Sequence, residues 1–204
     1  MDDTITTIYC LCDECLKAIG HRDDPQARLT TAEVMTVALV AAAFFGGNVE
    51  QARRFLSEYG YVPAQISKGR FNRRLHAIEP ELWRGLFSVL AGVFKGRNVQ
   101  GTYAVDSLPV AACDNIRIRR CRLYPPEEHG AGAFRGYIAS KRRYFYGLRV
   151  HLVVTQAGEP VRQYIETVFG GLSGLFSKKI HAVTPRGFEL KIVWFLLAFS
   201  IQCL

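Results

Sequence analysis

Residues 144–155 form the sequence YFYGLRVHLVVT, which carries the clearest strand pattern in the chain. Successive side chains of a strand point to opposite faces, and here the alternation separates an apolar set from a mixed set. The apolar set is Leu148, Val150, Leu152 and Val154, and the mixed set is Arg149, His151 and Val153. The pattern predicts a long strand within a sheet, with Arg149 and His151 on the same face.

Two shorter strands are predicted within TYAVDSLPVAACDNIRI, residues 102–118. The first covers 102–106 and ends at Asp106. The second covers 109–118 and is weakened by Pro109, which has no N–H for a sheet hydrogen bond. We expect the Asp106 strand to pair beside the long strand. The connection between them is polar and includes the basic groups RIRRCR and SKRR.

Helices are predicted on both sides of these strands. The first hundred residues contain four helix starts: a capping box at Thr30 and Glu33, Asn48, Ser67 and Pro80. A helical pattern resumes from about Pro160, and a last helix runs from Pro185 to Leu204. Helices followed by strands and more helices indicate an α+β (α/β-like) fold. We expect a helical bundle over residues 1–97 and a three-stranded sheet with C-terminal helices over residues 98–204.

The charge of the chain is concentrated in its second half. The formal net charge is +8, with 12 Lys and Arg against 11 Asp and Glu in residues 1–100, and 14 against 7 in residues 101–204. A basic half favours a polyanion such as nucleic acid over an acidic metabolite. A solvated basic surface is the alternative.

The six cysteines show no regular disulfide framework, and the opening MDDTITTIYC lacks the basic and apolar regions of a signal peptide. We therefore expect a cytoplasmic chain with free thiols. The apolar runs at 34–45 and 192–204 are shorter than the roughly 20 residues that a membrane span needs. Cys10, Cys12 and Cys15 with His21 could instead bind zinc, although three such positions do not share one helix face.

The predicted helix at 67–78 carries Arg70, Arg73 and Arg74 on one side and an apolar stripe on another. Three short helices of which the third presents arginines are similar to a helix-turn-helix arrangement that meets DNA. Arginines on an amphipathic helix are also common as solvated charge. Both interpretations stay open at this point.

Asp106 at a strand end of a basic chain suggests a metal site that acts on phosphodiesters. Two-metal phosphoryl transfer needs several carboxylates around cations about 4 Å apart, and Mg²⁺ prefers such oxygen ligands. The best candidate for a second ligand is Glu166 in QYIETVFGGL, on the helix predicted after Pro160.

Several blocks of the chain resemble bacterial insertion-sequence transposases of the DDE type, which have an RNase H-like core. The blocks are LTTAEVMTVALVAAAFFGGN (29–48), ISKGRFNRRLHAI (66–78), YAVDSLPVAACDNIRI (103–118), RGYIASKRRYFYGLRVHLVVT (135–155), IETVFGGL (165–172) and IHAVTPRGFELKIVWFLLAFSIQCL (180–204). The resemblance implies DNA binding and metal-dependent strand cleavage and transfer during transposition, with Mg²⁺ or Mn²⁺ as cofactor. It also implies double-stranded element ends as partner, and a homo-oligomer or a mixed oligomer with intact transposase.

Carried over by position, Asp106 matches the first catalytic aspartate and Glu166 the catalytic glutamate, both of them metal ligands. The N-terminal helices match the region expected to contact the element ends. Residues expected to contact DNA are Arg70, Arg73, Arg74, Lys141, Arg142, Arg143, Arg149 and His151.

The second catalytic aspartate of the family has no counterpart, because no Asp follows Asp114. In the family it follows the long strand after further strands, but here the predicted Glu166 helix begins about five residues after Thr155. An in-frame deletion near 159–163 would explain the loss and would truncate the RNase H-like domain. Asp114 and Glu159 are the remaining candidates for a replacement acid, or else solvated loop carboxylates.

Three hypotheses follow. The chain is an active transposase, a non-catalytic DNA-binding remnant that interferes with intact copies, or a decaying gene product that folds poorly. The second rests on the arginines and the charge. The third rests on the sheet edge that a loss of core strands would expose.

Overall fold

The structure is a computed structural model of the 204-residue chain, and it describes all residues except 64–66, 114, 126–131, 139–141 and 167–179. The side chains of residues 106–107, 115–116, 143 and 163–166 also lie outside the description. The chain divides into two compact units, one of Met1–Leu90 with Val193–Leu204 and one of Ala91–Ile192. The last turns of the C-terminal helix thus belong to the first unit, whereas the sequence assigns that whole helix to the second.

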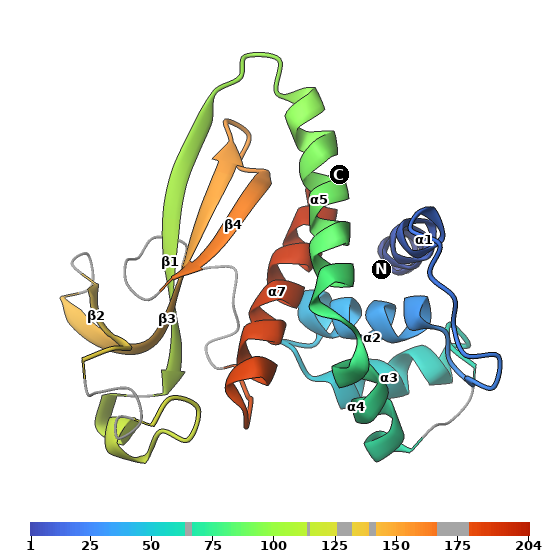
Figure 1. The fold of residues 1–204 in the computed structure, drawn as a ribbon, viewed down its shortest axis with the longest axis horizontal. Helices are drawn as coiled ribbons and strands as arrows, with labels where there is room; N and C mark the ends of the chain where they lie inside the picture. Colours follow the sequence, from blue (N-terminus) through green and yellow to red (C-terminus); the bar gives the residue numbers. More distant parts are fainter. Residues whose placement is uncertain (64–66, 114, 126–131, 139–141, 167–179) are drawn as a thin grey trace. The chain divides into compact units, whose positions relative to one another are not determined.

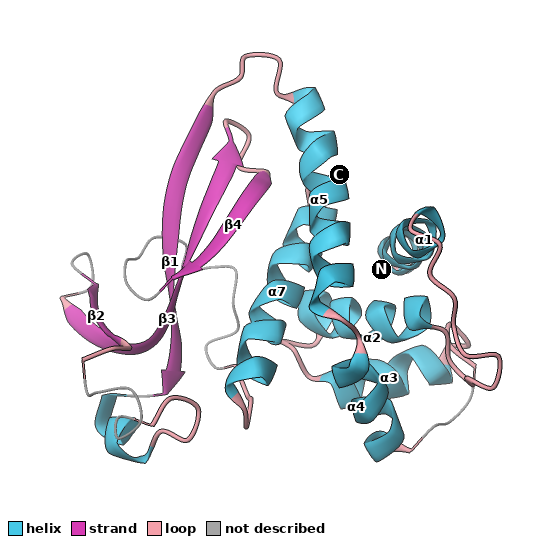
Figure 2. Ribbon diagram, viewed as in Figure 1, coloured by secondary structure: helices cyan, strands magenta, loops and turns pink. Residues whose placement is uncertain are grey.

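The first unit is built around α2 (Thr31–Phe44), of which eleven residues are buried. A helix that is apolar on every side is stable only when neighbours cover it. Here α1 (Asp2–Ala18), α3 (Val49–Glu58) and α4 (Lys68–Ala77) pack against α2. Figure 2 shows the helices of this unit in cyan.

The helix starts confirm the sequence prediction. Thr30 Oγ1 accepts a hydrogen bond from the Glu33 N–H at 3.1 Å, and Glu33 Oε2 accepts one from the Thr30 N–H at 2.6 Å. The Asn48 side chain caps α3, and the Ser67 side chain caps α4. Two further helices, α5 (Pro80–Arg97) and α7 (Pro185–Gln202), begin at the expected prolines.

Tryptophans connect α5 and α7 in the core of the first unit. Trp83 and Trp194 are both buried, and their ring centroids lie 5.8 Å apart. Among the described residues, no single helix is long and apolar enough to span a membrane. Together α2 and α3 meet that test, although they are bent by 111° at the turn between them.

The second unit contains an antiparallel sheet around β3 (Arg143–Thr155), as Figure 1 shows. One edge of β3 pairs with β1 (Tyr103–Cys113). The other edge pairs with β2 (Arg135–Ile138) near its start and with β4 (Pro160–Glu166) near its end. The mixed helix and sheet content agrees with the α+β prediction, and the sheet has four described strands instead of three.

The first difference from the sequence prediction lies in β1. The two strands expected at 102–106 and 109–118 form one strand that ends at Cys113 and is followed by the 3₁₀ helix η1 (Asn115–Arg120). Pro109 is tolerated inside it because β1 lies at an edge of the described sheet, where a missing N–H need not leave a neighbouring strand unpaired.

The second difference is that the helix expected from Pro160 is the strand β4. A tight turn causes this: the Thr155 N–H donates to the Glu159 carbonyl oxygen at 2.9 Å, and Gly158 has a φ of +85°. The turn brings the chain back along the free edge of β3. The following residues include β-branched Val161 and Ile165, which suit a strand. Pairing with β3 therefore prevails over the weak helical spacing.

A glycine is required where β1 bulges against β3. A Cβ on Gly147 would lie 2.1 Å from the Val110 carbonyl oxygen and 2.6 Å from the Ala112 nitrogen. Both of these atoms belong to the backbone, so neither can move aside as a flexible side chain can. The register shift between Ala111 and Cys113 occurs at this contact.

We predict that Gly147→Ala destabilises the chain by about 2 kcal/mol or more, because overpacking against backbone forces a strand to shift. Urea denaturation measures the change. Gly85→Ala is the matched control, since Gly85 lies in α5 with nothing within 4 Å of an added Cβ. The control should stabilise by up to about 1 kcal/mol. Equal stability of Gly147→Ala and wild type would contradict the bulge geometry.

Candidate functional site

The two acids matched to the catalytic cluster lie on different strands. In the register, Asp106 of β1 is opposite Leu152, and Glu166, the last residue of β4, is opposite Arg149. Glu166 is therefore at a strand end and not on a helix. Because β1 and β4 pair with opposite edges of β3, their backbones are separated by about 10 Å across the sheet.

The offset along β3 adds to this separation. Leu152 and Arg149 are three residues apart, which corresponds to about 10 Å along a strand and to opposite faces. The backbone register thus does not bring Asp106 and Glu166 together. The two backbone positions are thus far apart for residues whose carboxylates would both lie about 2 Å from one Mg²⁺ ion.

Arg149 and His151 share a face of β3 opposite Pro109 and Ser107, as their alternation predicts. Arg149 is fully buried, at 0% exposure, and burial lowers the pKa of its guanidinium to about 10. His151 is half-buried, and within the described part of the chain its Nε2 has no hydrogen-bond partner. A buried Arg149 is not presented to DNA, which corrects its assignment as a phosphate contact.

Of the other candidate residues, Glu159 lies in a described turn, whereas Asp114 and Lys141 do not belong to the described residues. Glu159 accepts a hydrogen bond from Thr155 Oγ1 at 2.8 Å, so it belongs to the turn between β3 and β4. The described side chains contain no group of three or more His, Cys, Asp or Glu that could hold a metal ion.

The three N-terminal cysteines lie in different environments. Cys10 is exposed and Cys12 is buried, and burial raises the pKa of the Cys12 thiol. Cys15 is intermediate, and burial raises its pKa as well. His21 contacts the Thr31 hydroxyl at 3.1 Å instead of a thiol.

The arginines of α4 separate into two kinds. Arg70 and Arg73 are exposed, on the side away from the buried residues Phe71 and Leu75. Arg74 is half-buried, and its Nη2 lies 3.2 Å from Asp23 Oδ1. All three are expected from the sequence to contact DNA, but the Arg74 guanidinium is already in an ion pair within the first unit.

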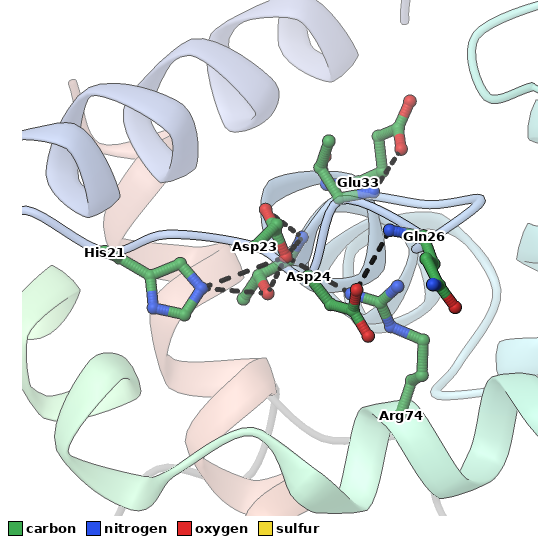
Figure 3. A network of polar contacts seen from close by, with 8 residues as sticks. His21, Asp23, Asp24, Gln26, Glu33 and Arg74 are labelled. Carbon is green, nitrogen blue, oxygen red and sulfur yellow. Dashed lines mark hydrogen bonds and ion pairs between the residues drawn. The ribbon is translucent and has the colours of Figure 1, made fainter.

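Asp23 is the centre of a polar network that the sequence analysis missed (Figure 3). Its carboxylate accepts hydrogen bonds from the Thr31 backbone N–H at 2.9 Å and from the Thr31 hydroxyl at 2.6 Å. Burial opposes the charged form, but the Thr31 hydrogen bonds and the nearby His21 and Arg74 lower the pKa of Asp23 overall. The carboxylate thereby fixes the loop between α1 and α2 at the start of α2 and connects it to α4.

A pocket of about 250 Å³ opens beside this network, lined by His21, Thr31, Arg74 and Glu79 with apolar side chains. Ligand pockets usually occupy about 300–1,000 Å³, so this one is small. The Arg74 guanidinium and the Thr31 hydroxyl in its lining both donate hydrogen bonds to the Asp23 carboxylate. The network is therefore a structural element of the helical unit.

The remaining expected DNA contacts lie in the hairpin between β2 and β3. Arg142 is exposed and has a φ of +47°, and Arg143 is the first residue of β3, with its side chain outside the description.

No family model matches the chain, and neither a curated protein nor a solved structure matches it.

We predict that Asp23→Asn lowers the free energy of unfolding by about 1 kcal/mol at neutral pH, because charge-assisted hydrogen bonds are lost from a partly exposed site. The folded pKa of Asp23 lies below the ordinary value of about 3.9, so its contribution is complete above that value. It is lost as the pH falls through the lower folded pKa. The difference between variant and wild type should therefore narrow below about pH 4.

Urea denaturation between pH 7 and pH 3 measures this effect. Asp24→Asn is the matched control, because Asp24 accepts one hydrogen bond, from the Gln26 N–H, that an amide oxygen can also accept. A stability difference for Asp23→Asn that stays constant over the whole pH range would contradict the role of the charge.

Proposed function

We propose that this chain is a DNA-binding derivative of a DDE-type insertion-sequence transposase, with impaired strand cleavage and transfer. Its second half is then a truncated RNase H-like domain, and double-stranded element ends are its partner. The resemblance of the sequence blocks supports the descent. The Asp106 strand β1 pairs with the long strand β3, as the strand pattern of the sequence predicts.

The observation that carries DNA binding is the state of the arginines on α4. Lys68, Arg70 and Arg73 are exposed, and none of them forms an ion pair with a described acidic residue. Other arginines of the helical unit are paired, as Arg53 is with Glu50 at 2.8 Å. Cations without an acidic neighbour are available to neutralise phosphates and release counterions.

The arrangement of the helices supports the same proposal. α4 packs against α2 and buries Phe71 and Leu75, whereas Arg70 and Arg73 are exposed. A rigid helix with a solvent-facing basic side is suited to contact the backbone of a duplex.

Impaired cleavage follows from the absent second aspartate and from the sheet register. Asp106 and Glu166 lie on opposite edges of β3, and no Asp follows Asp114 in the sequence. A metal cluster stabilises the transition state only when its ligands converge on one place. We therefore assign no catalytic step to these residues in this chain.

Arg73→Ala is expected to weaken binding to a duplex several-fold and to reduce the slope of log affinity against log salt concentration by about 1, since one phosphate contact is lost. Fluorescence anisotropy with a labelled duplex at several salt concentrations measures both quantities. Arg84→Ala is the matched control. Arg84 is also an exposed arginine, but its guanidinium pairs with the Glu81 carboxylate at 2.7 Å.

The control should leave the affinity within about twofold and the salt dependence unchanged. A lack of duplex binding at low salt would overturn the proposal. So would an equal loss for the two variants, because the effect would then reflect total charge and not the α4 surface.

Cleavage of a duplex that contains an element end should stay at background with Mg²⁺ or Mn²⁺, because the ligand set is incomplete. A gel assay of nicked products tests this expectation, with Asp106→Ala as the control. Metal-dependent cleavage by the wild-type chain that Asp106→Ala abolishes would show that an active centre assembles after all.

A further inference from the structure

The hairpin of β2 and β3 carries two exposed aromatic rings opposite one another. In the register, Tyr137 of β2 pairs with Tyr144 of β3, and Figure 1 shows the two strands side by side. Tyr137 is 45% exposed and Tyr144 is 51% exposed. Their ring centroids lie 5.0 Å apart, with 55° between the ring planes. This tilt keeps the rings from covering each other face to face.

A cation belongs to the same face of the hairpin. The guanidinium of Arg135 lies 4.7 Å from the centre of the Tyr144 ring, within the range of a cation–π contact. Arg135 is opposite Tyr146, two residues beyond Tyr144, and Tyr146 is fully buried with its hydroxyl donating to the Tyr124 carbonyl oxygen at 2.6 Å. The face is therefore anchored at one end and exposed at the other.

The other face of the hairpin fixes the position of these rings. The Phe145 ring lies over Gly136, where an added Cβ would come within 2.3 Å of it. Phe145 and Ile138 are both buried. An aromatic side chain that covers a cross-strand glycine holds the strand register, so the pair Tyr137 and Tyr144 is displayed on a fixed platform.

Exposed arginines lie in the same hairpin and on a segment that packs against its long strand. Arg142 in the hairpin is exposed, and so are Arg117, Arg119 and Arg120 of η1, a segment that packs against β3. Aromatic rings between arginines form the combination that holds single-stranded nucleic acid, in which bases stack on rings and cations follow the phosphates. A duplex offers no free base faces, because its bases are already stacked on each other.

We propose that the surface of Arg135, Tyr137, Tyr144 and Arg142 binds single-stranded DNA, with a base stacked on each tyrosine. The choice of DNA over RNA rests on the proposed function. The site itself is separate, since it uses other residues than the duplex-binding side of α4. The chain would then bind duplex through its first unit and unpaired strand through its second.

The test measures binding of a labelled oligo-dT strand and of a labelled duplex to the full chain by fluorescence anisotropy, at one salt concentration at which the wild-type chain binds both. Tyr137→Val and Tyr144→Val remove the rings but keep good strand formers. Each should weaken oligo-dT binding by about fivefold or more, because stacking on one ring is worth roughly that factor at least. Duplex binding should change by less than about twofold.

Tyr137→Phe and Tyr144→Phe are the matched controls, because they keep the stacking face and lose only the hydroxyl. They should bind oligo-dT nearly as wild type does. Arg73→Ala should weaken duplex binding and leave oligo-dT binding unchanged, which separates a failure of this inference from a failure of the proposed function. An unchanged oligo-dT affinity of the valine variants would overturn the inference, as would an equal loss in the phenylalanine variants.

Tyr144→Trp gives a second measurement that does not depend on the stability of the valine variants. Trp83 and Trp194 are buried in the first unit, so an indole at position 144 is an exposed reporter. Stacking of thymine should quench its emission on titration with oligo-dT, and an equal length of duplex should quench it little. Absence of quenching at saturating oligo-dT would contradict base stacking at this position.

Discussion

Every described strand of the sheet pairs with β3, so the register of this one strand decides where the candidate residues of the second unit lie. Its thirteen residues hold β1 on one edge and both β2 and β4 on the other. Because successive residues alternate between faces, a difference of one in register moves a residue to the other side of the sheet. Leu148, Val150 and Leu152 fix that choice, since they are buried together.

This constraint separates the residues that a transposase would need together. Asp106 is aligned with Leu152, and Arg149 and His151 belong to the opposite face of β3 from Leu152. Glu166 is aligned with Arg149, across the far edge. The turn at Thr155–Glu159 produces this alignment, because it brings β4 directly back onto β3. In a chain with further strands after β3, one of those strands could pair with the edge of β3 that β4 occupies here, and the chain after Thr155 would lead into it.

The sequence predicted the elements with local signals and failed where long-range pairing decides. Thr30, Asn48 and Ser67 cap helices where expected, since each cap needs only residues three positions away. The strand at 160–166 was missed because only the free edge of β3 makes that segment extended. Arg149 could not be recognised as buried, because its environment comes from packing. The Asp23 contact with Arg74 spans 51 positions in the chain and has no local pattern.

The charge of the chain illustrates the same limit at its surface. A net charge of +8 does not say which cations are available, since an arginine beside a carboxylate contributes little field. Arg53, Arg74 and Arg84 are paired with acids within the helical unit. The arginines on the outer side of α4 and those on the β2–β3 hairpin also differ in the side chains beside them. Arg135 lies against an exposed aromatic ring, which offers a flat apolar face in addition to the charge. We therefore propose different forms of one polymer for the two basic surfaces, because a base can stack on a ring only where it is unpaired.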